Sequence, residues 1–137
     1  MPELTNANGT IMVERESWLH VAWMLQDKNW HGSEETAALG HDIERMARMP
    51  RTEWDSGDAW LVPVDLTLTE DEMRTICKEA TSHLAFRFTY ARHNDTHDLW
   101  NAAARITMIA HLADNLIKGF ERDRDAADGL HRPDGTI

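Results

Sequence analysis

Hydrophobic residues recur every three or four positions along four stretches of the chain, which is the spacing of one face of an α-helix. The clearest repeat runs from Leu99 through Ile106 and Ala113 to Phe120. The pattern predicts helices over about residues 14–28, 33–49, 69–93 and 97–122. We therefore expect an all-α fold, a compact bundle of four principal helices.

Residues at the predicted helix ends agree with this division. Ser33 is a suitable N-cap for the second helix, and Pro50 stops it. Thr69 and Glu72 are spaced as a capping box, in which each side chain accepts a hydrogen bond from the other residue's backbone N–H. The third helix is therefore expected to begin at this pair.

The stretch 50–68 lacks helical spacing. It contains the turn signal Ser56-Gly57-Asp58, and apolar residues then alternate up to Leu68 with Pro63 interrupting them. We expect one long ordered loop or a short edge strand here. The domain division that follows is an extended lead-in over 1–13, a single helical domain over 14–122 and a peripheral charged tail over 123–137.

Composition narrows the function classes. With 24 acidic and 14 basic residues the net charge is −10, which argues against a surface that wraps nucleic acid. No apolar run approaches the roughly 20 residues that span a bilayer, and the start of the chain has no signal-peptide pattern. The single Cys77 allows no intrachain disulfide. We expect a cytoplasmic protein, compatible with a homo-oligomer, that makes no membrane contact.

Three polar elements stand in apolar, alanine-rich surroundings on the predicted helices. They are His20, the pair His41-Asp42 and Asp114. Imidazole and carboxylate groups are the ligands that hold a divalent metal able to activate water. If the four side chains converge, they predict a metal site.

The order of these elements resembles the HD-domain superfamily of metal-dependent phosphohydrolases. The matching segments are His20 in His-Val-Ala-Trp-Met-Leu, His41-Asp42 in Ala-Ala-Leu-Gly-His-Asp-Ile and Asp114 in Leu-Ala-Asp-Asn-Leu. The resemblance covers roughly residues 15–120, with about a dozen closely matching positions. Two departures are the short gap between His20 and His41, and Glu44-Arg45 where the family often has Gly-Lys.

The resemblance implies hydrolysis of a small phosphorylated molecule such as a nucleotide. His20, His41, Asp42 and Asp114 would hold Mn, Fe, Co, Mg or Zn. Catalytic roles would fall to Asp42 beside the metal-bound water and to Glu44 as a general base. The predicted substrate-binding residues are Arg15 and Arg45 for phosphate, and Trp54 and Trp60 for stacking.

Other interpretations of the same residues need no phosphohydrolase. His20 fits a core histidine, and Asp114 fits an ion pair with Lys118 at i, i+4. A His–carboxylate pair on each helix, such as Glu79 with His83, also suits a di-iron bundle, although Glu-x-x-His is absent. The main alternative function is a non-enzymatic helical binding or assembly protein acting through protein–protein contacts, which the six tryptophans suit.

Overall fold

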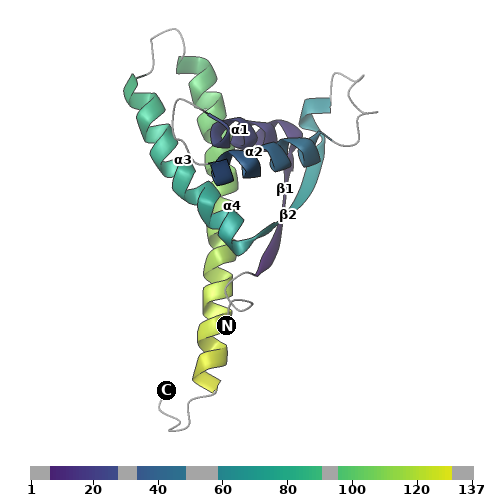
Figure 1. The fold of residues 1–137 in the computed structure, drawn as a ribbon, viewed down its shortest axis with the longest axis vertical. Helices are drawn as coiled ribbons and strands as arrows, with labels where there is room; N and C mark the ends of the chain where they lie inside the picture. The colour runs from purple at the N-terminus through teal and green to yellow at the C-terminus, as the bar shows by residue number, and fades with distance from the viewer. Residues whose placement is uncertain (1–6, 28–33, 49–58, 91–95, 131–137) are drawn as a thin grey trace.

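The computed structural model describes residues 7–27, 34–48, 59–90 and 96–130, and its fold is mostly helical (Figure 1). The elements in chain order are β1 (Asn8–Glu14), α1 (Arg15–Leu25), α2 (Glu34–Ala47), the short 3₁₀ helix η3 (Ala59–Leu61), β2 (Pro63–Thr69), α3 (Glu70–Tyr90) and α4 (Thr96–Leu130). The four predicted helices are confirmed. The fourth is longer than expected, because it continues to Leu130 instead of ending near residue 122.

The expectation of an all-α fold was wrong in one respect, because β1 and β2 form a two-stranded antiparallel sheet. Ile11 lies opposite Leu66 and Val13 opposite Val64, and these side chains face the core. On the other face, the hydroxyls of Thr10 and Thr67 hydrogen-bond at 2.7 Å. The expected lead-in and the expected edge strand are therefore partners in one sheet.

The start of α3 has the predicted capping box. Thr69 N–H donates to Glu72 Oε1 at 2.8 Å, and Glu72 N–H donates to Thr69 Oγ1 at 3.2 Å. Both hydrogen bonds satisfy donors that the first turn of a helix leaves unpaired. β2 therefore passes directly into α3 without an intervening loop.

The core is assembled from both strands and all four helices. Trp18 is fully buried, and its indole N–H donates to the Val64 carbonyl at 2.9 Å, which satisfies its only polar group. The other core side chains include Ile11, Leu19, Leu25, Ile43, Leu68, Met73, Ile76, Ile109 and Ala113. α1 packs against α2 and α4, and α3 packs along α4.

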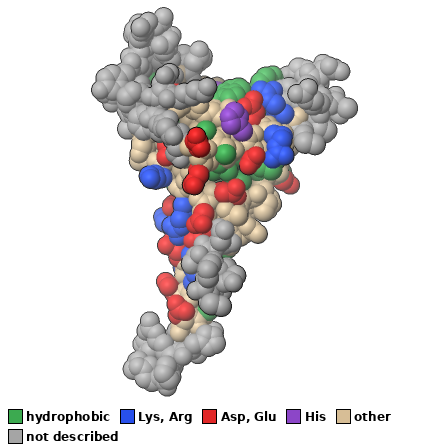
Figure 2. Space-filling view, viewed as in Figure 1, with side chains coloured by type: hydrophobic (Ala, Val, Ile, Leu, Met, Phe, Trp, Pro, Cys, Tyr) green, Lys and Arg blue, Asp and Glu red, His purple; other side chains and the backbone are tan. Residues whose placement is uncertain are grey.

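The sheet and the helices around the core form a broad head. The C-terminal part of α4 continues past this head as a narrow stem (Figures 1 and 2).

α1 and α2 approach each other closely at Gly40. A Cβ atom at this position would lie 2.7 Å from the Ala22 carbonyl oxygen and 3.0 Å from Leu25 Cβ. The first of these neighbours is backbone and cannot move without shifting α1. Glycine is therefore needed for this helix contact, although it lowers intrinsic helix propensity.

We predict that Gly40→Ala destabilises the protein by about 1–3 kcal/mol, because overpacking against the α1 backbone outweighs alanine's better helix propensity. Urea unfolding measures the effect. Gly119→Ala is the matched control in α4, where the nearest atom to an added Cβ is Arg122 Nη2 at 3.9 Å. That variant should gain about 0.5–1 kcal/mol. Equal effects at the two glycines would contradict the close-contact explanation.

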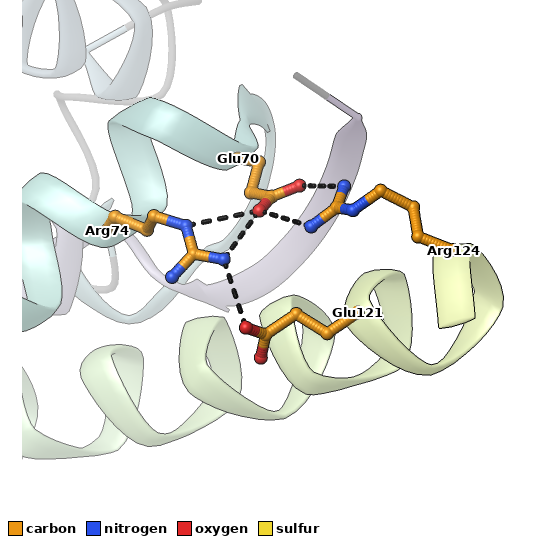
Figure 3. A network of polar contacts seen from close by, with 4 residues as sticks. All are labelled: Glu70, Arg74, Glu121 and Arg124. Carbon is orange, nitrogen blue, oxygen red and sulfur yellow. Dashed lines mark hydrogen bonds and ion pairs between the residues drawn. The ribbon is translucent and has the colours of Figure 1, made fainter. Parts of the chain in front are cut away.

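A buried carboxylate joins the first turn of α3 to the stem of α4 (Figure 3). Glu70 is only 2% exposed, and Arg124 donates to both of its oxygens at 2.7 and 2.8 Å. Arg74, one turn along α3, donates to Glu70 Oε2 at 2.7 Å and pairs with Glu121 at 3.4 Å. The hydrogen bonds from Arg124, and then those from Arg74, lower the pKa of Glu70 to about 2. Glu70 N–H also donates to the Ala7 carbonyl at 2.6 Å, which attaches the beginning of β1.

We predict that Glu70→Gln lowers the free energy of unfolding by about 2 kcal/mol at neutral pH, because two guanidinium groups lose their shared anion. The folded-state pKa lies below the unfolded value of 4.5, so this stabilisation is complete above pH 4.5 and is lost as the pH falls toward 2. Urea unfolding at several pH values should therefore show a weaker acid dependence for Glu70→Gln. Glu121→Gln, at a half-exposed position, should behave like wild type. An unchanged acid dependence in Glu70→Gln would contradict the assignment.

Candidate functional site

His20 lies on α1 in a partly buried position beside two neighbours on the same helix. Its Nε2 is 3.8 Å from Glu16 Oε1, and its ring meets Trp23 edge-on with centroids 5.4 Å apart. Burial lowers the pKa of His20 below 6.5, against the opposing effect of Glu16. The lowered pKa favours the neutral imidazole, which is the form that binds a metal. The same contacts are also those of a histidine packed at the protein surface.

The pair His41-Asp42 is exposed on the outer side of α2. The buried residues of this helix are Thr36, Leu39, Gly40, Ile43 and Ala47. His41 and Asp42 occupy the opposite side, and Asp42 Oδ1 accepts a hydrogen bond from Arg45 Nη2 at 3.1 Å. The apolar neighbours in the sequence therefore do not enclose the pair, because a helix turns by 100° per residue and separates positions 39 and 43 from 41 and 42.

Asp114 makes the ion pair that its spacing to Lys118 predicts. Lys118 Nζ lies 2.9 Å from Asp114 Oδ2, and both side chains are about half exposed or more, at 61% and 46%. Such exposed pairs at i, i+4 contribute little to stability. The contact nevertheless accounts for an acidic residue here without a metal ion.

The four predicted metal ligands are not gathered at one position. Among the described residues, no three His, Cys, Asp or Glu side chains form a group that could hold a metal ion. Asp42 is engaged by Arg45 and Asp114 by Lys118, each on its own helix. The divalent metal and the resemblance to HD phosphohydrolases therefore stay predictions from the sequence, with no support from the arrangement of these side chains.

Glu44, the predicted general base, connects α2 to α1. Gln26 Nε2 donates to Glu44 Oε1 at 3.0 Å, and Arg48 Nε donates to Oε2 at the same distance. The hydrogen bond from Gln26, followed by the contacts from Arg48, lowers the pKa of Glu44. A lowered pKa makes the carboxylate a weaker base, so its contacts favour an interhelical role.

Arg15 does not face solvent as a phosphate-binding residue would. It is fully buried; Nε donates to the Ala47 carbonyl and Nη1 to the Ala59 carbonyl, both at 2.6 Å. Ala47 is the last residue of α2, so the guanidinium meets the negative end of the helix dipole. Arg15 therefore links the end of α2 to η3.

The other predicted substrate-binding residues lie in different places. Arg45 is exposed at 71% of its side chain and pairs with Asp42. Trp60 lies on η3 and is 39% exposed. Trp54 is outside the described residues. The structure thus places Arg15, Arg45 and Trp60 in three separate settings, one buried and two exposed.

Two polar clusters were not found from the sequence. Arg105 on α4 reaches α1, with Nη1 3.1 Å from Ser17 Oγ and Nη2 3.0 Å from Glu16 Oε2. His83 on α3 is buried, and its Nε2 lies 2.9 Å from Asp27 Oδ2 just after α1. The apolar repeat of the third helix could have indicated a buried His83, since it follows Ile76 and Ala80 at helical spacing.

Between Trp100 and Asn115, the side of α4 that faces away from the core carries a surface of unusual composition, which we call the outer strip; the next exposed residue on this side, Lys118, is charged. Its members are the exposed residues Trp100, Asn101, Ala104, Thr107, Met108, His111 and Asn115. None is Asp, Glu, Lys or Arg, although such residues make up 28% of the chain. Trp100 is 61% exposed and Met108 is 42% exposed. The face shown in Figure 2 carries acidic and basic side chains beside hydrophobic ones.

Comparison with known proteins gives no match to a family model, a curated protein or a solved structure. Within the described part of the chain, no helix is long and apolar enough to cross a membrane. The functional interpretation therefore depends on the geometry given above.

We predict that Arg15→Lys destabilises the protein by about 2–4 kcal/mol, because lysine cannot reproduce the two-sided hydrogen bonding and leaves a buried carbonyl unsatisfied. Arg45 is the other arginine predicted to bind phosphate, and it is exposed. Arg45→Lys should therefore change stability by less than about 0.5 kcal/mol. Thermal unfolding of both variants distinguishes the two arginines. If Arg15→Lys unfolds like wild type, the buried arginine does not hold α2 to η3.

Proposed function

We propose that this chain is a non-enzymatic helical binding or assembly protein that acts through protein–protein contacts, and that α4 carries its docking surface. The outer strip is the observation that supports this proposal. Aromatic residues and methionine are enriched at the centres of protein interfaces, and acidic residues and lysine are depleted there. The strip combines Trp100 and Met108 with the absence of charge.

A helix is the occupant that the strip fits best. The strip lies on a 35-residue helix whose backbone groups are hydrogen-bonded within the helix, so it offers no edge for a strand. Trp100 and Met108 project on either side of the small Ala104, which forms the ridge-and-groove relief that helices pack into. The partner helix must itself be apolar or uncharged, because no charge on the strip would pair with a buried ion.

The metal-dependent hydrolysis of a small phosphorylated molecule stays a prediction from the sequence. It requires His20, His41, Asp42 and Asp114 to share one ion, whereas the described residues form no such group. Some of the basic side chains make their contacts within the fold, as Arg15 and Arg105 illustrate. The geometry therefore supports docking better than catalysis.

We predict that Trp100→Glu weakens binding of a helical partner at least tenfold, because it replaces the largest apolar side chain of the docking surface with a charge. A partner retained by the tagged wild-type protein is identified, purified and titrated against each variant by calorimetry. Met12→Glu is the control, since Met12 is 64% exposed on β1, away from the strip. It should bind like wild type.

Two results would overturn the proposal. One is equal binding of the purified partner by wild type and Trp100→Glu. The other is metal-dependent phosphate release from a nucleotide that wild type catalyses and the His41→Ala/Asp42→Ala variant does not, with the metal confirmed by elemental analysis. The second result would establish the hydrolase predicted from the sequence.

A further inference from the structure

The backbone N–H and C=O groups of β1 alternate between β2 and the open edge of the strand. In an antiparallel pair, opposite residues alternately exchange two hydrogen bonds or none. Two bonds at the ends of the sheet fix this alternation: Arg15 N–H donates to the Val62 carbonyl at 2.9 Å, and Glu70 N–H donates to the Ala7 carbonyl at 2.6 Å. In the observed register, the odd-numbered residues of β1 therefore bond to β2. The even-numbered residues that direct their backbone groups to the open edge are Asn8, Thr10 and Met12.

This edge has no hydrogen-bonding partner in the described part of the chain. The sheet contains two strands, so no described strand lies on the other side of β1. Among the described residues, the backbone hydrogen bonds between elements do not involve Asn8, Thr10 or Met12, and all three residues are exposed. Their N–H and C=O groups repeat every two residues, about 6.8 Å apart, which is the repeat of an extended chain. Such an edge is a template for another strand.

The open edge of β2 is protected, whereas that of β1 is not. Pro63 has no backbone N–H, and the N–H of Thr69, which points away from β1, donates to Glu72 Oε1 at 2.8 Å. Asp65 places a charge between them. Proline and charged residues are two means by which proteins prevent pairing at an edge strand. The segment 8–12 of β1 contains neither, so the sheet is open to pairing on this side.

A strand added to β1 would lie beside α4. α4 packs against β1, whereas α2 packs against β2. The contact is close at Gly9, where an added Cβ would lie 2.9 Å from Leu116 Cδ1 of α4. A neighbouring strand lies about 4.8 Å away, which is less than the width of a helix. Leu112, one turn before Leu116, is also a partly buried hydrophobic residue. The side chains that the added strand turns toward α4 must therefore be apolar.

The outer face of the sheet predicts the charge of the alternate side chains. Met12 lies opposite Asp65, and Glu14 follows on the same face of β1. The outer positions of the two strands carry these two carboxylates and no lysine or arginine. Glu14 is 3.4 Å from Arg105, whereas Asp65 has no ion pair with a described residue. A lysine or arginine on the added strand would lay its apolar stem along Met12, which is 64% exposed, and reach Asp65 with its charged end.

We propose that the open edge of β1, from Asn8 to Met12, binds an extended segment of a partner protein by β-strand addition. The segment alternates apolar side chains, which face α4, with basic side chains, which face Asp65. The net charge of −10 favours a basic partner over an acidic one or a second copy. The inference does not depend on the docking role of the outer strip, because the backbone of β1 carries it.

Three labelled peptides test the chemistry of the partner in fluorescence anisotropy titrations with the full chain. The peptides alternate valine with lysine, valine with glutamate, or proline with lysine. The valine–lysine peptide should bind at least about tenfold more tightly than the other two. The proline–lysine peptide has the same charge but lacks half of the N–H groups, so it measures non-specific attraction to an acidic protein. No binding of the valine–lysine peptide, or equal binding of any two peptides that include it, would overturn the proposal.

A matched pair of proline substitutions tests the edge. Thr10 and Thr67 lie opposite each other, so Thr10→Pro and Thr67→Pro each remove an outward N–H and the same 2.7 Å hydroxyl hydrogen bond. Thr10→Pro should weaken binding of the valine–lysine peptide at least about tenfold, because it blocks the edge of β1. Thr67→Pro alters the edge of β2 and should bind the peptide like wild type. Urea unfolding checks that both variants fold, and equal peptide binding by the two folded variants would reject the edge of β1.

Amide hydrogen exchange of the wild-type protein gives a second measurement that needs no substitution. Saturation with the valine–lysine peptide should slow exchange at Asn8, Thr10 and Met12, because their N–H groups become hydrogen-bonded. Exchange at Asp65 and Thr67, on the edge of β2, should not change. Protection of the β2 edge, or of neither edge, would overturn the proposal even if the proline variants do not fold.

Discussion

Glu70 is the residue on which the placement of α3, β1 and the stem of α4 depends: its carboxylate joins α3 to the stem, and its backbone N–H donates to the Ala7 carbonyl at the beginning of β1. Removing a carboxylate from water is costly, and here two guanidinium groups and its position in the first turn of α3 offset that cost. Phe120 is the last described apolar residue of α4 that packs against the hydrophobic core, so Arg124 extends the attachment about one turn beyond it. The register of α4 is thus fixed at one end by apolar packing and at the other by an ion pair.

The same contacts fix the orientation of the outer strip. A docking surface on a single helix is useful only if that helix is held in one orientation. α4 is held by α1 through Arg105, by α3 along its length, and by Glu70 beyond the core. The strip faces away from all three contacts. It can therefore bind without disturbing the packing that orients it.

The four helices and the capping box at Thr69 were predictable because their signals are local, repeating within one or two turns. The pairing of β1 with β2 was not, since Thr10 and Thr67 are 57 residues apart and each segment is too short to show its partner. The surroundings of the candidate site residues were not predictable for a related reason. Apolar neighbours of His41 in the sequence lie on another side of the helix, and the carbonyls that Arg15 meets have no residue-type signature.

The distribution of charged side chains explains why the outer strip differs from the rest of the surface. Arginines that a phosphate could have attracted instead join elements: Arg15 links α2 to η3, Arg105 links α4 to α1, and Arg124 links α4 to α3. The chain as a whole has 24 acidic and 14 basic residues, and this negative excess opposes contact with nucleic acid and other acidic surfaces. A partner can therefore bind without burying an unpaired charge only at a surface that has no charged side chains. On the described helices, the outer strip of α4 is such a place, which is why we assign it the docking role.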